Sequence, residues 1–265
     1  MKTLLALPLL VAACAAPAAD SGAKADVRGV AVEYRHGDAV LQGWMAWDAS
    51  VSGRRPGVLV THEWRGHNDY ARRRAEQLAG LGYVAFALDL YGKGVMAKDH
   101  VEAAQRAGAF KKDRAHLRAR AKAGYDVLAK HELCDPSRIV ALGYCFGGTT
   151  SLELARSGAA LAGAASFHGD LSTPNPEDAK NIKGKVVAFH GAEDPHYQDD
   201  HVLAFMKEMR AAKADWRVVF LGGAVHSFTV PDAGSDPSKG SAYDAKADAR
   251  SWEMLVDFLR ECFAR

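Results

Sequence analysis

The chain contains 265 residues, 48% of them hydrophobic, which is enough apolar material to bury one sizeable core. Chains of this length are often a single domain, and we expect one domain here. Lysine and arginine total 34 against 32 for aspartate and glutamate. This near balance argues against nucleic acid or a charged polymer as the main partner.

The first 19 residues have the pattern of a secretory signal peptide. Lys2 precedes an apolar run over residues 4–13 that is too short to span a bilayer, so we expect no membrane span. Two processing sites remain open. The residues before Cys14 resemble a bacterial lipobox, which would place a lipid anchor on Cys14, whereas Ala16-Pro17-Ala18 suits ordinary signal peptidase. We slightly favour simple export, and on either route the expected location is a bacterial periplasm.

A polar linker over residues 20–26 leads into a single domain predicted over 27–265. The domain opens with two stretches, 27–34 and 39–47, in which apolar and polar residues alternate around a short turn. This pattern is typical of an antiparallel hairpin. Residues 54–57 contain Pro-Gly and are predicted to break the chain before the next strand.

After the hairpin, short apolar runs alternate with helical patterns. Such alternation indicates βαβ units with right-handed crossovers, and hence an α/β fold with an open, mostly parallel sheet and helices on both faces. The buried strands are predicted at residues 58–60, 84–88, 139–142, 161–167, 185–190 and 216–221. The helices are predicted at residues 68–81, 98–108, 111–131, 149–157, 201–212 and from about 242 to the end of the chain.

The sequence Gly143-Tyr144-Cys145-Phe146-Gly147-Gly148 lies between a predicted strand and a predicted helix. A nucleophile at the apex of such a turn is held in a strained backbone, and small residues must flank it at two positions before and two after. Gly143 and Gly147 meet that requirement, and cysteine replaces the usual serine. The helix N-terminus would favour the Cys145 thiolate. Taken alone, the pattern favours a buried structural cysteine in a glycine-rich turn over a nucleophile.

Two further side chains follow strands in the order that a nucleophile, acid and base would require. Asp194 comes after the strand predicted at 185–190, and His226 after the strand predicted at 216–221. Parallel strands end at the same edge of a sheet, so these groups should meet Cys145 there. Glu193 competes for the acid role, and we prefer Asp194 because it directly precedes a proline.

The loop after the strand at 58–60 reads His62-Glu63-Trp64-Arg65-Gly66-His67. A zinc site is not expected, because the two histidines are five residues apart at a strand-to-loop junction, whereas the helical zinc motif needs four. The loop instead suits an oxyanion hole. We expect the backbone N–H groups of Trp64 and Phe146 to bind the oxygen of a tetrahedral intermediate.

These segments together resemble the dienelactone hydrolase family over about residues 27–264, and the resemblance implies an α/β-hydrolase fold. The resemblance rests on Glu63, Asp89-Leu90-Tyr91, the glycine-rich turn around Cys145, Asp194 and His226-Ser227-Phe228. The resemblance implies that Cys145 is the nucleophile, His226 its base and acid, and Asp194 the group that orients His226. It also implies that Glu63 holds the resting thiol by a hydrogen bond and then moves to help it ionise.

The sequence departs from the dienelactone-cleaving members where they bind the substrate carboxylate. Those members have two arginines there, and the matching positions in this sequence hold Lys93 and Val230. Lysine keeps the charge without the bidentate geometry, and valine keeps neither. We expect Lys93, Trp64 and Tyr91 to line the substrate site, while the natural substrate stays open.

An exported chain would retain Cys134, Cys145 and Cys262. Three thiols cannot all pair internally, so at least one is free or bonds another molecule, and whether Cys134 and Cys262 pair is open.

The leading hypothesis is a monomeric, exported hydrolase that cleaves small esters or lactones through a thioester acyl-enzyme. It would need no cofactor and no metal ion. Two alternatives come from other classes. One is a thiol redox or stress-sensing protein that uses Cys145 without hydrolysis, although no C-x-x-C motif is present. The other is a non-catalytic, ligand-binding relative of a hydrolase.

Overall fold

The computed structural model describes residues 25–264, so the predicted signal peptide, Cys14 and most of the predicted linker lie outside the described residues. The strands are β1 (Val27–His36), β2 (Ala39–Asp48), β3 (Arg55–Thr61), β4 (Val84–Leu88), β5 (Cys134–Tyr144), β6 (Gly163–Phe167), β7 (Lys185–Gly191) and β8 (Trp216–Leu221). The helices are α1 (Asp69–Gly80), α2 (His100–Lys112), α3 (Arg114–Lys130), α4 (Phe146–Arg156), α5 (Asp199–Ala212) and α6 (Ala245–Phe263).

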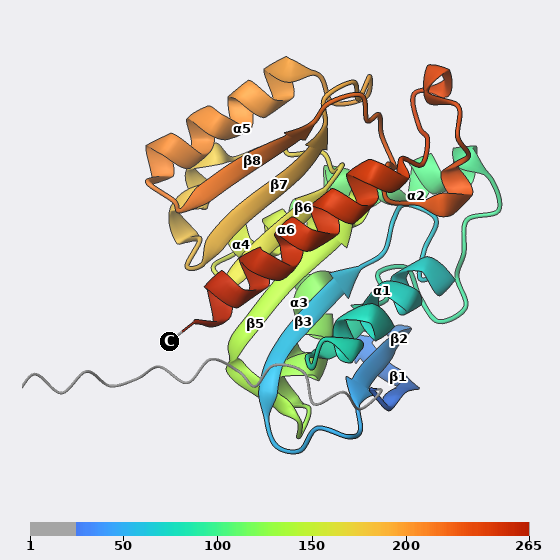
Figure 1. The fold of residues 1–265 in the computed structure, drawn as a ribbon, viewed down its shortest axis with the longest axis vertical. Coiled ribbons are helices and arrows are strands. Elements are labelled where there is room, and N and C mark those ends of the chain that lie inside the picture. The colour runs from blue at the N-terminus through green and yellow to red at the C-terminus, as the bar shows by residue number, and fades with distance from the viewer. Residues whose placement is uncertain (1–24, 265) are drawn as a thin grey trace, which may run out of the picture.

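All eight strands form one sheet in the order β1-β2-β4-β3-β5-β6-β7-β8 (Figure 1). The β1–β2 hairpin and the β2–β4 pair are antiparallel, and every other neighbouring pair is parallel. The predicted α/β-hydrolase arrangement, with an N-terminal antiparallel hairpin, is confirmed. The strand order reverses direction at the β3–β5 pair, and ligands of open α/β sheets bind at the carboxyl ends of the strands beside such a switch point.

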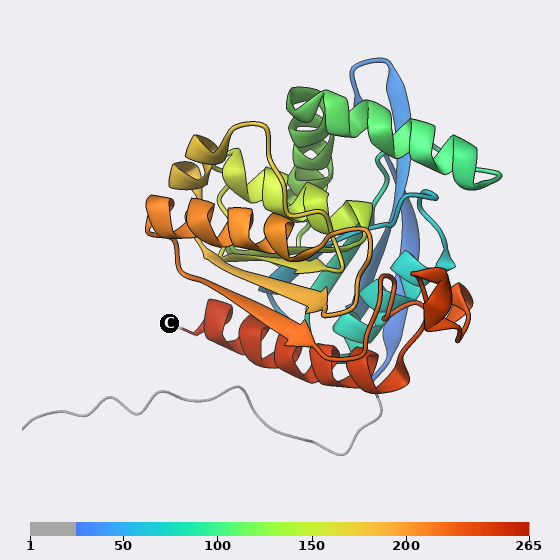
Figure 2. The same ribbon diagram turned by 90° about the horizontal axis from the view of Figure 1, so that it is seen from above.

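Helices cover both faces of the sheet, as Figure 2 shows from above. Helices α1 and α6 pack on one face, where α6 contacts β5, β6 and β7. Helices α3, α4 and α5 cover the other face, with α2 against α3. Each face has its own apolar core, so the parallel strands are buried on both sides. None of the helices in residues 25–264 is both long enough and apolar enough to cross a membrane.

The break predicted at residues 54–57 is wrong, because β3 already begins at Arg55. Arg55 pairs with the start of β5, and the register then shifts between Pro56 and Gly57. A bulge of this kind tolerates proline inside a strand, because the missing N–H falls where the ladder is already interrupted. Gly57 is needed there, since a Cβ would lie 2.7 Å from Cys134 Sγ.

The three cysteines of the described chain are all free. Cys134 is buried at the start of β5, and Cys262 is half-buried in α6. Burial raises the pKa of the Cys134 thiol to about 11 and that of Cys262 to about 12. Both thiols therefore stay protonated at neutral pH and are poor nucleophiles.

Helix α4 is held on the sheet by a fully buried ion cluster. Arg156 has no exposed surface, and its guanidinium donates to both carboxylate oxygens of Glu208 on α5 at 2.8 Å. The same group donates to Glu153 at 3.1 Å and to the Leu171 carbonyl at 2.8 Å. The cluster thus joins the end of α4 to α5 and to the loop after β6.

We predict that Arg156→Leu lowers the free energy of unfolding by about 3–5 kcal/mol, because it leaves the Glu208 carboxylate buried without a partner and leaves Glu153 with Arg118 alone. Urea denaturation followed by circular dichroism measures the change. Arg260→Leu is the matched control, since the Arg260–Asp257 ion pair is 69% and 73% exposed, and it should cost less than about 1 kcal/mol. Equal losses in the two variants would contradict the account of the cluster.

Candidate active site

Cys145 lies at the turn between β5 and α4 with φ 53° and ψ −118°, a conformation that non-glycine residues rarely adopt. Close backbone contacts hold this turn. A Cβ on Gly143 would lie 2.1 Å from the Gly147 carbonyl oxygen, and a Cβ on Gly147 would lie 2.2 Å from the Thr61 carbonyl oxygen at the end of β3. Only glycine at both positions lets strand, helix and the β3 loop approach this closely.

The structure brings Cys145, His226 and Asp194 together. His226 Nε2 lies 3.2 Å from Cys145 Sγ, and His226 Nδ1 lies 2.8 Å from Asp194 Oδ2. Asp194 also accepts the His196 backbone N–H at 2.8 Å, which fixes the carboxylate in its loop. Glu193, the alternative acid, is exposed, whereas Asp194 is buried.

The electrostatics of this cluster favour a charged imidazole. Burial alone would lower the pKa of His226, but the negative charges of Cys145 and Asp194 outweigh it and raise the pKa to about 10. Burial works against the Asp194 carboxylate as well, yet its hydrogen bond with His226 holds the pKa of Asp194 below its usual value. The surroundings of His226 therefore favour the charged form of its imidazole.

Backbone N–H groups are available beside the thiol. Phe146 is the first residue of α4, so its N–H has no partner within the helix. The Trp64 N–H makes no backbone hydrogen bond within residues 25–264. The close packing of Gly147 on Thr61 and His62 brings the β3 loop and the start of α4 to one place. These are the two donors that the sequence predicts.

Glu63 is buried in the loop that follows β3. Burial raises the pKa of Glu63 to about 7, against the opposing charges of His226 and Arg65. The predicted hydrogen bond from Glu63 to the resting thiol stays a prediction. The carboxyl group does carry a proton for part of the time at neutral pH.

Aromatic side chains form the wall next to the thiol. The Tyr91 ring stacks on Phe146 and Phe110 at centroid distances of 6.1 and 5.9 Å, and its hydroxyl donates to the Trp64 carbonyl at 2.8 Å. Lys93 lies at the exposed edge of the sheet in an ion pair with Glu33. The predicted role of Lys93 in binding substrate therefore requires it to leave that pair.

Sequence reasoning missed a cation near His226. Lys111 Nζ on α2 donates to Asp170 and to the Tyr197 hydroxyl, both at 3.0 Å. The Tyr197 ring lies 5.7 Å from the His226 ring. Lys111 occurs in a basic helical stretch that resembles a solvated surface, so its sequence context carried no signal.

Sequence reasoning also missed His168, which directly follows β6. It is fully buried, it has φ 40°, and its ring lies 5.1 Å from the His226 ring in an edge-on arrangement. The rule that found Asp194 and His226, a polar residue just past the carboxyl end of a parallel strand, would have found His168 too.

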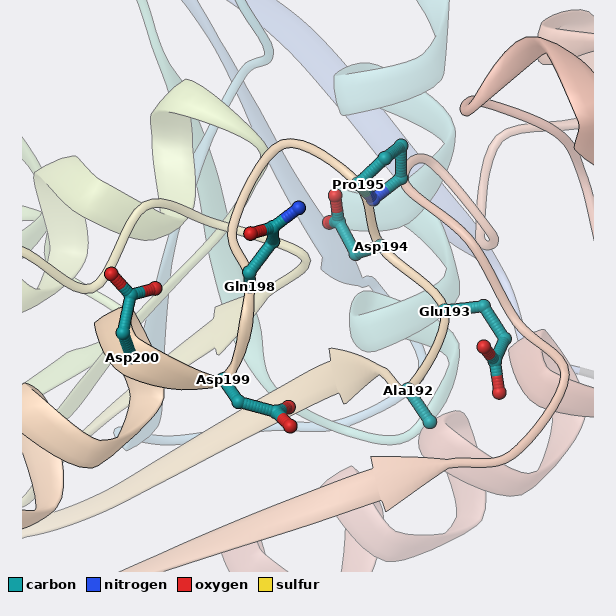
Figure 3. A pocket seen from close by; sticks show the side chains of 7 residues that line it. All are labelled: Ala192, Glu193, Asp194, Pro195, Gln198, Asp199 and Asp200. Carbon is teal, nitrogen blue, oxygen red and sulfur yellow. The ribbon is translucent and has the colours of Figure 1, made fainter.

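A hollow of about 440 Å³ is lined by the loop after β7 and the start of α5 (Figure 3). Cys145 and His226 do not line it, so an ester bound there would not meet the thiol. Its lining consists of Ala192, Glu193, Asp194, Pro195, Gln198, Asp199 and Asp200.

Within residues 25–264, no three side chains of histidine, cysteine, aspartate or glutamate converge in a way that could hold a metal ion. Both ring nitrogens of His62 face protein atoms instead. Nδ1 lies 2.5 Å from the Glu63 carbonyl oxygen, and Nε2 accepts the Leu90 N–H at 3.2 Å.

An eight-stranded sheet of this topology, with a strained thiol turn at the carboxyl end of β5, defines the α/β-hydrolase class. Residues 41–263 match the model of the dienelactone hydrolase family, and the chain belongs to that family. It is therefore an enzyme of the carboxylic ester and lactone hydrolase kind.

Three relatives cover most of the chain. The crystal structure of a dienelactone hydrolase-like promiscuous phosphotriesterase, P91, from metagenomic libraries is 43% identical with a TM-score of 0.86, covering 90% of this chain and 100% of that one. "Protein usf" of Aquifex pyrophilus is 27% identical and covers 88% and 98%. A Bradyrhizobium protein named "Probable 2-oxo-3-(5-oxofuran-2-ylidene)propanoate lactonase" is 28% identical and covers 79% and 85%.

The raised pKa of Glu63 predicts a pH-dependent stability. Between about 4.5, the ordinary value, and about 7 the folded protein binds more protons at Glu63 than the unfolded chain, so stability falls as pH rises through this window. In Glu63→Gln this fall is absent. The free energy of unfolding of the variant, minus that of the wild type, should grow by about 3 kcal/mol from pH 4.5 to 7.5.

Urea denaturation at a series of pH values measures this difference. The exposed Glu253→Gln on α6 is the control and should track the wild type throughout. A difference between Glu63→Gln and the wild type that does not change with pH would show that Glu63 titrates as an ordinary glutamate.

Proposed function

We propose that this enzyme cleaves small ester or lactone bonds with Cys145 as nucleophile, through a thioester acyl-enzyme. The observation that carries the proposal is the 3.2 Å distance between Cys145 Sγ and His226 Nε2, with Asp194 on the opposite nitrogen. A nucleophile, a base within hydrogen-bond reach and a third group orienting that base are the requirements of covalent acyl transfer.

In the acylation half, the Cys145 proton passes to His226 Nε2, and the thiolate attacks the carbonyl carbon. The carbonyl oxygen becomes an oxyanion, which the N–H groups of Trp64 and Phe146 stabilise. Collapse of the tetrahedral species breaks the bond to the leaving oxygen, and the imidazolium of His226 protonates that oxygen. The products are an alcohol, or the opened end of a lactone, and a thioester on Cys145.

In the deacylation half, neutral His226 removes a proton from water, and the hydroxide attacks the thioester carbon. Collapse of this second intermediate returns the thiolate and releases the carboxylic acid, and the imidazolium keeps the proton for the next cycle. Asp194 holds the Nδ1–H tautomer and the positive charge in both halves. This scheme uses only groups of the chain and water, and we propose no cofactor.

Glu63 has a proposed gating role. Its protonated form can donate to the thiol and keep it unreactive, and its ionised form can accept a hydrogen bond from the S–H and help the thiol lose its proton to His226. The pKa near 7 lets both forms exist at neutral pH. Lys93, Trp64 and Tyr91 are proposed to contact the substrate, and the aromatic wall favours a small, flat acyl group.

Phosphotriester cleavage is a second candidate. The observation in its favour is the 43% identity with a promiscuous phosphotriesterase over 90% of this chain. The same thiolate would attack phosphorus, expel an aryloxide and leave a thiophosphoryl group on Cys145 for water to hydrolyse.

We predict that Cys145→Ala lowers kcat on p-nitrophenyl acetate by at least about a thousandfold, because the covalent route is lost. The assay reads p-nitrophenolate release. The matched control is Cys262→Ala, which removes a half-buried thiol on α6 and should keep the activity. Paraoxon in place of the ester tests the second candidate with the same two variants.

Intact mass spectrometry under acidic quench should show one acetyl group on the wild type and none on Cys145→Ala. Activity that persists in Cys145→Ala after removal of contaminating esterases would overturn the proposal. Sulfenic acid or disulfide forms of Cys145 after peroxide, with no acyl adduct after ester treatment, would favour the redox function instead.

We also propose that the enzyme works in a bacterial periplasm, on the strength of the leader pattern over residues 1–19. Expression of the full chain in a bacterium, followed by cell fractionation and intact mass measurement, tests this. The expected products are a periplasmic protein that begins near residue 20, or a membrane-anchored one with a lipid on Cys14. An unprocessed protein in the cytoplasm would refute export.

A further inference from the structure

Three of the four non-glycine residues with positive φ in the described chain meet around the His168 ring. They are Cys145 at 53°, His168 at 40° and Ser227 at 58°, which directly follows His226. Such backbone conformations persist only where the surrounding structure over-determines them. The contacts that hold these three turns together therefore decide where the thiol and its base lie.

The imidazole of His168 bridges the first and third of these turns. Its Nδ1 accepts a hydrogen bond from the Cys145 backbone N–H at 3.2 Å. The same N–H also donates to the Phe167 carbonyl at 2.9 Å. Its Nε2 lies 2.8 Å from Thr229 Oγ1, on the loop that carries His226. His168 and Thr229 are both fully buried, so water cannot replace either contact.

The direction of these hydrogen bonds follows from the backbone. An N–H can only donate, so Nδ1 of His168 must be the unprotonated nitrogen, and Nε2 carries the proton and donates to Thr229. The Thr229 and Tyr70 hydroxyls share a hydrogen bond of 2.7 Å, for which either oxygen can supply the proton, and the Tyr70 oxygen accepts from Arg74 Nε at 3.2 Å. Arg74 donates in addition to the Thr229 carbonyl at 3.0 Å and pairs with Asp248 on α6.

The chain of bonds thus runs from the nucleophile turn, through the histidine loop, to α1 and α6. Burial holds the pKa of His168 well below its ordinary value, with the charge of His226 acting in the same direction, which keeps the ring in this neutral form. The His226 ring packs edge-on against it at 5.1 Å. His168 therefore packs against the His226 ring and limits its position on that side.

We propose that His168 and Thr229 are positioning residues that hold Cys145 and His226 in register for proton transfer. They touch neither substrate nor the reacting atoms, and they act through the Cys145 backbone and the His226 loop. A small displacement between a nucleophile and its base lowers the rate of the chemical step without weakening the binding of a small substrate. This inference rests on the proposed function, because it is stated in terms of ester turnover.

Two variants each remove one end of the bridge. Thr229→Val keeps the shape and loses the hydroxyl, and His168→Gln keeps a donor toward Thr229 but loses the acceptor for the Cys145 N–H. We expect each to lower kcat per folded molecule by about tenfold, with KM for p-nitrophenyl acetate within about twofold. Thr229→Ser, which retains the hydroxyl, should recover most of the lost kcat.

Ser251→Ala is the matched control. It removes another fully buried hydroxyl, one that donates to the Asp248 carbonyl on α6 at 3.0 Å, and should lower the melting temperature without changing kcat per folded molecule. If Thr229→Val and His168→Gln behave like this control, the bridge is merely structural and the proposal is overturned. Failure of Thr229→Ser to recover kcat would overturn it as well.

A readout without substrate separates this proposal from the proposed function. The rate of iodoacetamide alkylation at the Cys145 peptide, measured by mass spectrometry at pH 7, reports the thiolate that His226 stabilises. It should fall by about tenfold in Thr229→Val and His168→Gln, and not in Ser251→Ala. If the wild type hydrolyses no ester but alkylation is still slower in Thr229→Val and His168→Gln than in the wild type and Ser251→Ala, the proposed function fails and the positioning role stands. Unchanged alkylation in both variants refutes the positioning role whatever the esterase result.

Discussion

The site depends on one strained backbone turn, in which Cys145 is forced into the left-handed region between β5 and α4. A conformation of this kind costs on the order of 1–3 kcal/mol and is stable only where packing leaves the chain no alternative. Here Gly143 lies against Gly147, and Gly147 lies against the end of β3. The same close approach lifts the thiol above the carboxyl edge of the sheet and places the first N–H of α4 beside it.

Two buried imidazoles 5.1 Å apart have pKa values shifted in opposite directions. His226 lies between Cys145 and the Asp194 carboxylate, and its interactions with both raise its pKa, so its charged form is favoured. His168 accepts a backbone N–H, faces no anion, and is kept neutral by burial. The two rings have different proposed roles: His226 transfers protons, and His168 positions Cys145 and the His226 loop. Glu63 adds a third titratable group with a pKa near neutrality.

Much of the site could be predicted because parallel strands end at one edge of the sheet. Asp194 and His226 each follow such a strand, so a rule about strand ends was sufficient to bring them to Cys145. The same rule holds for His168, which directly follows β6. The contact between Lys111 and Tyr197 could not be predicted in this way. Lys111 lies on a helix and Tyr197 on a loop, and their relative position depends on packing, which the local sequence does not specify. Lys93, by contrast, has the expected charge but pairs with Glu33 at the exposed edge.

The sequence alone determined the α/β class, the hairpin, the strained turn and the order of nucleophile, acid and base, because these follow from local periodicity, glycine spacing and chain order. Only the tertiary structure decided that Asp194 rather than Glu193 contacts His226, that β3 begins at Arg55 on a bulge, and that His168 bridges two loops 61 residues apart at Thr229. These features depend on distances between segments that are remote in the chain. Such distances are set by the packing of whole helices and strands, which no short stretch of sequence specifies.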